Sequence, residues 1–316
     1  MKARPHLLQR YELEPELLPQ LPVDWPQEFG REAPMAVEIG FGNGEYLDWW
    51  SGQRPDWNFV GIEMPQDCVI RALPKFEQNQ REHVRIVRGD ARYLLRELFA
   101  PDSLQHVLMQ FPMPWTKAKQ AKHRVYSPRF SATLADVLKV GGLFELVTDQ
   151  QWYADETAEV LGDSGYFKII ERQTNPDRAF RTRYEEKWLA DKRDIFRVVA
   201  QIQKATSAPR LLNQEEMEIV HLQQRPTADA VQALTSKRFT QGQSVFEVKE
   251  VFTAKDGWFL YVVTSDESFA QHCYVRVQEK KDGRVLVRLQ ARPRPYQTPA
   301  VHFALQEIGR QLCPAS

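Results

Sequence analysis

The chain has 316 residues, with 42 Lys and Arg against 42 Asp and Glu, so its formal net charge is zero and any basic surface must be local. Its 42% hydrophobic and 27% charged residues exclude a disordered chain, and no apolar run approaches the roughly 18 residues of a membrane span. Three widely spaced cysteines and the lack of a signal-peptide core predict a reduced, cytoplasmic protein without a cysteine metal site. The length predicts two domains.

Residues 1–33 contain five prolines and predict an extended N-terminal arm. Between residues 34 and 203, short apolar strands alternate with helical stretches. The strands are expected at 36–40, 58–63, 84–87, 106–111, 143–148, 167–170 and 195–199. The helices between them are expected at 45–50, 67–79, 91–99, 127–139 and 151–164. This alternation predicts an α/β domain with an open, mostly parallel sheet and helices on both faces.

A polar stretch at 203–209 predicts a linker, and residues 210–316 predict a second, α+β module. We expect a helix over 213–224 and a closing helix over 299–312. Strands are expected at 245–252, 258–264, 274–278 and 285–289, and Asp256-Gly257 and Asp282-Gly283 are typical hairpin turns. The module is therefore predicted to contain an antiparallel sheet.

A glycine-rich loop follows the first predicted strand. In the run from Glu38 through Gly40 and Gly42 to Gly44, the glycines allow positive φ and close approach of a ligand. Glu63 ends the second strand, at the edge of the sheet where ligands bind, and could accept both hydroxyls of a ribose. A dinucleotide, S-adenosylmethionine and a tight turn without a ligand all remain open. Glu38 favours S-adenosylmethionine, because a carboxylate attracts its amino and sulfonium groups but repels a pyrophosphate.

Two later loops carry further candidates for the same crevice. Asp90-Ala91, after the third strand, could receive an adenine amino group or cap the next helix. After the fourth strand, Phe111-Pro112-Met113-Pro114-Trp115 predicts a rigid loop whose Trp115 offers a flat face to a base. Basic residues follow before the next acid, at Lys117, Lys119, Lys122 and Arg124. A basic patch beside an aromatic ring favours RNA, with a solvated charge run as the other interpretation.

Six segments with this chemistry occur in a distinctive order. They are Glu38 to Gly44, Gly61-Ile62-Glu63, Asp90-Ala91, the Phe-Pro-x-Pro-Trp-x-Lys run at 111–117, Thr148-Asp149 and Thr182-Arg183-Tyr184-Glu185. Together they resemble the bacterial tRNA (guanine-N7-)-methyltransferase family over about residues 35–199. The resemblance implies a class I, Rossmann-like methyltransferase fold. It also implies methyl transfer from S-adenosylmethionine to N7 of a guanine in the tRNA variable loop.

The resemblance further implies roles for the matching residues. Those implied to hold S-adenosylmethionine are Glu38, Gly40, Gly42, Gly44, Glu63, Asp90 and Ala91. Those implied to hold the substrate guanosine are Lys117, Asp149, Thr182, Arg183, Tyr184 and Glu185. Candidate RNA contacts are Trp115, Lys119, Lys122 and Arg124. The expected partner is tRNA, with no metal and no membrane, and we expect a monomer. Asp149 could instead cap the helix predicted from 151.

One position departs from the family pattern, which reads Phe-Pro-Asp-Pro-Trp with a catalytic Asp. This chain has Met113 there, and methionine neither carries charge nor accepts a strong hydrogen bond. Guanine N7 has an in-plane lone pair and no proton to lose, so no general base is needed. Losing one carboxylate then costs about 10²–10³-fold in rate by analogy with oxyanion-hole donors. Two hypotheses follow: an enzyme with Met113 and Asp149 at the catalytic positions, or an RNA-binding pseudoenzyme.

The C-terminal module resembles no family that we recognise. Its last strands and loops carry the basic residues Arg276, Lys280, Lys281, Arg284, Arg288, Arg292 and Arg294, with Tyr274 and Tyr296 nearby. Residues 210–316 nevertheless hold 14 Lys and Arg against 12 Asp and Glu, a net charge of only +2. An RNA-binding face and a solvated basic sheet edge are therefore equally open interpretations.

Overall fold

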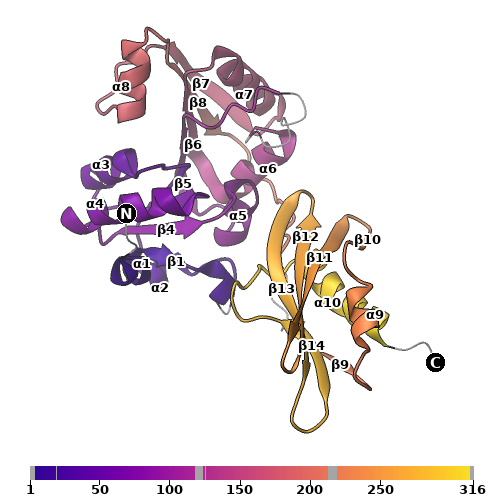
Figure 1. Ribbon diagram of the computed structural model, residues 1–316. Helices are drawn as coiled ribbons and strands as arrows, with labels where there is room; N and C mark the ends of the chain where they lie inside the picture. The colour runs from indigo at the N-terminus through magenta and orange to yellow at the C-terminus, as the bar shows by residue number, and fades with distance from the viewer. Residues whose placement is uncertain (1–3, 19, 118–123, 125, 213–218, 314–316) are drawn as a thin grey trace. The chain divides into compact units, whose positions relative to one another are not determined.

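The computed structural model describes residues 4–18, 20–117, 124, 126–212 and 219–313, and Figure 1 shows their helices and strands. They form two compact units. The first comprises Met1–Pro15 and Gln20–Arg210, and the second comprises Glu16–Pro19 and Leu211–Ser316. Among the described residues, no helix combines the length and the apolar character needed to cross a lipid bilayer.

The first unit is built on an eight-stranded sheet in the order β1-β4-β3-β2-β5-β6-β8-β7. The strands are β1 Glu12–Leu13, β2 Met35–Ile39, β3 Asn58–Glu63, β4 Val84–Arg88, β5 Leu104–Gln110, β6 Leu138–Thr148, β7 Phe167–Thr174 and β8 Phe196–Ile202. All pairs are parallel except β6–β8 and β7–β8. The prediction of an open, mostly parallel sheet is therefore confirmed.

The strand order reverses at β2, which has β3 on one side and β5 on the other. Because crossovers between parallel strands are right-handed, α3 and α4 cover one face and α5 and α6 the other. These helices, with two later ones, are α3 Glu45–Gln53, α4 Gln66–Gln78, α5 Ala91–Leu98, α6 Pro128–Val137, α7 Gln151–Asp163 and α8 Arg183–Ala190. On the first face, Trp50 of α3 and Phe76 of α4 share a core with Phe59 and Ile86. The reversal opens a ligand crevice at the carboxyl ends of the strands.

The N-terminal segment differs from the extended arm that its prolines predicted. It forms helix α1 Pro5–Tyr11, a short 3₁₀ turn at Pro15–Leu17 and helix α2 Trp25–Phe29, and β1 joins the edge of the sheet beside β4. Leu7 and Tyr11, four residues apart on α1, are fully buried against the α4 side of the core. Burial of Leu7 and Tyr11 thus stabilises a helix here. The prolines do not prevent it, because Pro5 stands in the first turn, where a helix tolerates proline.

The second unit contains a six-stranded sheet, all antiparallel, in the order β10-β11-β12-β13-β14-β9. Its elements are β9 Val220–Leu222, α9 Ala228–Gln232, β10 Arg238–Gln241, β11 Ser244–Ala254, β12 Gly257–Asp266, β13 Phe269–Glu279, β14 Val285–Leu289 and α10 Pro299–Leu312. The predicted α+β module with an antiparallel sheet is confirmed. The helix predicted over 213–224 is wrong where the structure describes it, because the alternating run at Val220–Leu222 pairs with β14 as strand β9.

Candidate active site

A cavity of about 790 Å³ lies at the carboxyl ends of the central strands of the first unit. Its lining comes from the loop after β2, the ends of β3 and β5, the start of α5, and α8. The acidic residues that line it are Glu38, Glu45, Glu63 and Asp90. A cavity of this size suits a small molecule, and it coincides with the reversal of strand order described above.

The glycine loop shapes one wall of this cavity. Gly40 and Gly42 line it and have φ values of +72° and +54°. A Cβ at either position would meet nothing within 4 Å, so the backbone itself faces open space. Gly44 serves a different purpose, since it caps α3 and a Cβ there would come within 2.7 Å of the Ala72 Cβ. It is therefore a packing glycine rather than a lining one.

Two carboxylates stand at the ends of β2 and β3. Glu63 accepts hydrogen bonds from the backbone N–H of Gly42 at 2.7 Å and of Met64 at 2.8 Å, which fixes both of its oxygens. Glu38 is buried, and its Oε1 accepts from the Gln110 side chain at 3.1 Å. Its Oε2 is buried and has no hydrogen-bond partner among the described residues. Burial raises the pKa of Glu38 to about 8.

Asp90 combines the two roles that its sequence position left open. It lines the cavity, and its Oδ1 caps α5 by accepting from the backbone N–H of Arg92 at 3.0 Å. The Arg92 guanidinium also bonds this carboxylate, with Nε 3.0 Å from Oδ1. Ala91 follows at the first position of the helix and lines the same wall.

The loop after β5 forms the opposite wall, with Met113 and Trp115 among the lining residues. Phe111 and Trp115 have φ values of +48° and +45°, which non-glycine residues adopt rarely and at a cost of about 1–3 kcal/mol. The Trp115 carbonyl accepts from Arg124 Nε and Nη2, each at 3.2 Å. Arg124 also bonds Tyr126 and lies over the Trp152 ring at 4.7 Å, so its contacts hold this strained loop in place.

Helix α8 closes the cavity from the other side. Thr182 caps the helix, accepting from the backbone N–H of Glu185 at 3.3 Å, and Thr182, Tyr184 and Trp188 line the cavity. The side chain of Arg183 turns away and bonds Glu45, whose Oε2 also accepts from the Arg183 backbone N–H at 3.1 Å. This double contact ties the start of α8 to the start of α3.

A buried polar network runs beneath α8 towards β2. The Glu185 carboxylate is 2.6 Å from Nη1 of Arg178, and both side chains are almost completely buried. Arg178 also donates to Oε1 of Gln110, whose amide donates to Glu38. Burial raises the pKa of Glu185, while the neighbouring Arg178 and Arg181 act in the opposite direction. The chain of bonds therefore links the Thr182–Glu185 segment to Glu38 at the end of β2.

Comparisons with known proteins give the following similarities. Among solved structures, an antibiotic-related methyltransferase superposes with a TM-score of 0.45 at 17% identity, covering 55% of this chain and 92% of that chain. A family model described as "Putative methyltransferase" matches residues 32–198. A tRNA (guanine-N(7)-)-methyltransferase of Thermus thermophilus is 30% identical, over 82% of this chain and 84% of that protein. One of Thermotoga maritima is 36% identical, over 96% of this chain and 96% of that protein. The chain belongs to the tRNA (guanine-N(7)-)-methyltransferase family.

Family membership extends into the C-terminal module. The alignment with the Thermotoga maritima protein spans 304 residues of this chain, so most of residues 210–316 lie within it. Sequence motifs alone had placed the resemblance only over about residues 35–199. The sequence similarity to this relative therefore covers most of both units.

The structure does not bring every expected residue of this methyltransferase to the cavity. Asp149 is not among the lining residues; its Oδ2 accepts from Arg193 at 3.1 Å and from Gln150 at 2.7 Å. It makes no capping bond to α7, whose N-cap is Gln150. Lys117 is exposed at the end of the β5 loop. Lys119 and Lys122 lie outside the described residues.

Three residues that sequence reasoning missed belong to this site of the methyltransferase. Gln110 is a polar residue at the carboxyl end of an otherwise apolar strand, and that position was the signal that could have found it. Trp188 also lines the cavity. It lies one helical turn after Tyr184, and this spacing of two aromatic residues was the signal in the sequence that could have found it. Arg178 stands in a loop before α8, and no periodicity or motif in the sequence indicates its contact with Glu185.

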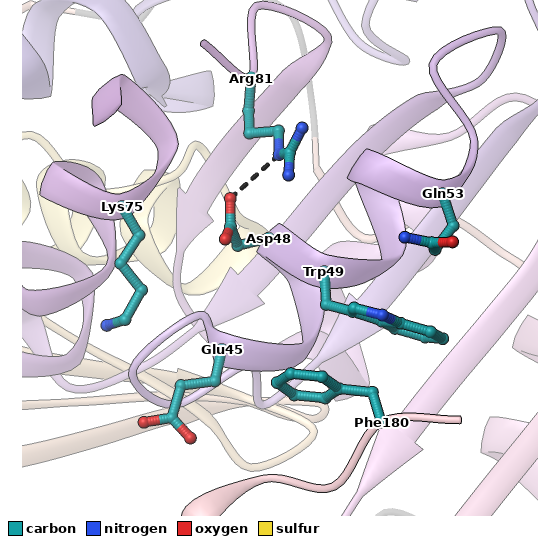
Figure 2. A pocket seen from close by; sticks show the side chains of 7 residues that line it. All are labelled: Glu45, Asp48, Trp49, Gln53, Lys75, Arg81 and Phe180. Atoms are coloured by element: carbon teal, nitrogen blue, oxygen red, sulfur yellow. Dashed lines mark hydrogen bonds and ion pairs between the residues drawn. The ribbon is translucent and has the colours of Figure 1, made fainter. Parts of the chain in front are cut away.

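A smaller hollow of about 320 Å³ lies beside the cavity, and Figure 2 shows its lining side chains. The rings of Trp49 and Phe180 stack there with centroids 5.3 Å apart, and Arg81 Nε is 3.0 Å from Oδ1 of Asp48. Lys75 donates to the Asn43 carbonyl at 2.8 Å. Asp48 thus pairs with Arg81, Lys75 bonds the glycine loop and Trp49 packs on Phe180, so these contacts support the glycine loop and the segment before α8.

Proposed function

We propose that this methyltransferase transfers a methyl group from S-adenosylmethionine to N7 of a guanine in the variable loop of tRNA. The observation that carries the proposal is the pair of carboxylates at the ends of β2 and β3, set in the cavity of a family member. Relatives of that name, aligned over most of the chain, favour an enzyme over the RNA-binding pseudoenzyme.

The cavity suits the cofactor group by group. The buried Oε2 of Glu38, which has no partner among the described residues, is an acceptor for the ammonium of the methionine part. Glu63 is held by two backbone N–H groups with lone pairs left over for ribose hydroxyls. We assign Asp90 and Ala91, which line the same cavity, to the adenine edge. When bound, the cofactor supplies an electrophilic methyl group carried by a sulfonium.

On the substrate side, the chain needs to orient a guanine rather than to remove a proton. The N7 lone pair lies in the ring plane, so the required work is positioning of the ring edge and stabilisation of the charge that develops on the purine. Thr182 and Tyr184 face the cavity from α8, and Trp115 faces it from the β5 loop. We assign these three residues to holding the guanosine, with Glu185 and Arg178 setting the position of α8.

Met113 lines the cavity where the family has its Asp. Asp149 and Glu185, two carboxylates that the resemblance assigns to the substrate, are each engaged by an arginine and neither lines the cavity. The nearby lining carboxylates are instead Glu38, Glu45, Glu63 and Asp90, of which Glu45 is bonded to Arg183. We therefore propose that the β5 loop and α8 accelerate methyl transfer by positioning the guanosine, and that Met113 contributes an uncharged contact.

The test is incorporation of labelled methyl from S-adenosylmethionine into unmodified bulk tRNA, together with calorimetric titration of S-adenosylhomocysteine. The proposal predicts steady turnover and saturable cofactor binding. We expect Glu63→Gln to weaken cofactor binding about tenfold, because one charged acceptor of the ribose hydroxyls is lost. Binding of both ligands without any incorporation would overturn the enzyme and leave the pseudoenzyme.

A further inference from the structure

The sheet of the second unit has one covered face. Side chains that alternate along β12 and β13, such as Leu260, Val262 and Val275, form a core with Leu305 and Ile308 of α10. Val231 of α9 belongs to the same core. Helices α9 and α10 therefore cover the same side of the sheet, and the side chains at the alternate strand positions point away from them.

The opposite face carries a cluster of five rings, Phe252, Phe259, Tyr261, His272 and Tyr274, which we call the ring face. The strand register places Phe252 opposite Phe259, Tyr261 opposite Tyr274, and Val263 opposite His272. Tyr261 has its ring centroid 5.4 Å from that of Tyr274 and 5.8 Å from that of His272. Phe252 is 44% exposed, and the other four are exposed or half-buried. The rings thus form a partly open aromatic platform.

Positive charge lies along one side of this platform. Arg276 stands opposite Phe259, with its guanidinium 5.0 Å from that ring, and Arg288 follows on β14. Residues 276–294 contain seven Lys and Arg against two acids, a net charge of +5. Within the described part of the chain, no ion pair involves the side chains of Lys280, Lys281, Arg288, Arg292 or Arg294. Three acids lie near these residues: Asp256 pairs with Arg276 at 2.6 Å, and Glu247 and Glu250 lie on β11, where Glu250 stands opposite Tyr261. Arg288 and the unpaired basic residues of the β13–β14 hairpin and the following loop therefore supply the available positive charge.

We propose that the ring face binds unpaired nucleotides of RNA, with bases stacked on Tyr261, Tyr274 and Phe259 and the phosphates along Arg276, Arg288 and the β13–β14 hairpin. An aromatic platform beside a basic strip is the combination that single-stranded RNA requires, because every base has a flat face and every linkage carries a negative charge. The surface is separate from the methyl-transfer cavity, whose lining residues all belong to the first unit.

The main competing occupant is a second copy of the chain. Such an interface would favour an apolar, charge-poor centre. Here two of the rings carry hydroxyls, one is an imidazole, and two arginines stand within the same rows. The charge of the strip therefore favours a polyanion over another copy of a chain whose net charge is zero.

The experiment measures the affinity of the full chain for a labelled single-stranded oligoribonucleotide of about 12 nucleotides, a length within the range that such surfaces cover. Tyr274→Leu keeps apolar volume but removes the flat ring, and we expect it to weaken binding about tenfold. Tyr274→Phe keeps the ring and should bind as the wild type does. Native circular dichroism and an unchanged Tm establish that each variant is folded.

A test variant and a control variant address the basic strip. Arg288→Ala should lower the slope of log affinity against log salt by about one. Arg310→Ala removes an exposed arginine of α10, on the covered side, and should leave the slope unchanged. Wild-type affinity in folded Tyr274→Leu, or an unchanged slope in Arg288→Ala, would overturn the proposal. The proposal would also be overturned if these variants had a lower molecular mass than the wild type on sedimentation while their RNA affinity was unchanged. That result would assign the ring face to a second copy of the chain.

Methyl transfer to tRNA is measured on the same preparations as an independent result. A wild-type chain that methylates no tRNA, while Tyr274→Leu still loses affinity for RNA, would refute the proposed function and leave the ring face standing. The reverse outcome, turnover with no dependence of RNA affinity on Tyr274, would refute only the ring face.

Discussion

Met113 is 65% exposed on the wall of the cavity, in the loop that Arg124 ties down through the Trp115 carbonyl. A carboxylate there would meet the charge that develops on the purine without displacing any buried neighbour. We therefore expect Met113→Asp to raise the rate of methyl transfer by about 10²-fold, the lower end of the range for a single electrostatic contact. Single-turnover rates with tRNA measure the effect, and Met113→Asn is the neutral control. No gain in Met113→Asp, with both ligands still bound, would show that the missing carboxylate does not limit the rate.

Glu38 makes the ligand-free protein sensitive to pH. Burial raises its pKa from 4.5 to about 8, so between these values the folded state holds a proton that the unfolded state has released. The free energy of unfolding should therefore fall as pH rises from about 4.5 to 8 and then level off. Glu38→Gln should remove this contribution and flatten the curve, as urea unfolding of the ligand-free protein at several pH values would measure. Identical pH profiles for the two proteins would contradict the raised pKa.

At this scale the sequence predicted which carboxylates converge at the strand ends better than it predicted the contacts of the loop residues. Glu38, Glu63 and Asp90 follow strand ends, and parallel strands bring their carboxyl ends together, so their convergence follows from topology. Asp149 also follows a strand end, yet Arg193 from the segment before β8 engages it. Contacts made by loop residues such as Arg178 and Arg193 depend on chain geometry that no local pattern encodes.

The buried bonds of Arg178 link the segment between β7 and α8 to both α8 and β5. Removing this charge in Arg178→Met leaves the Glu185 carboxylate buried without its 2.6 Å partner, a change that typically costs about 3–5 kcal/mol. The double variant Arg178→Met/Glu185→Gln removes the stranded charge as well and should recover much of the loss. Urea unfolding of the wild type, both single variants and the double variant measures the coupling. Additive effects would show that the ion pair does not hold α8.

Elements with strong periodicity were predicted closely, and short ones were not. Strands β2 to β8 of the first sheet, strands β11 to β14 of the second and the closing helix α10 overlap the segments in which their apolar patterns place them. Helix α1 was missed because its signal is a single pair, Leu7 and Tyr11, among prolines. Strand β9 was mistaken for helix because three residues carry no period, and only its pairing with β14 decides their conformation.

At the scale of the whole molecule, every residue that lines the cavity belongs to the first unit, so we expect cofactor binding not to depend on the stability of the second. Leu260 is fully buried in the core of the second unit, and Leu260→Ala should destabilise that unit by about 3 kcal/mol. Cofactor affinity should nevertheless stay at the wild-type value under native conditions. Urea unfolding and calorimetric titration of S-adenosylhomocysteine test the two halves of this prediction. A large loss of cofactor affinity in the folded variant would contradict the division.

The most direct test of methyl transfer to guanine N7 compares two tRNA transcripts, one made with guanosine and the other with 7-deazaguanosine, which lacks N7. After incubation with S-adenosylmethionine, digestion and nucleoside analysis identify the methylated base. The account predicts N7-methylguanosine from the first transcript and no methylated purine from the second. Methylation of the 7-deaza transcript, or any other methylated nucleoside as the main product, would contradict it.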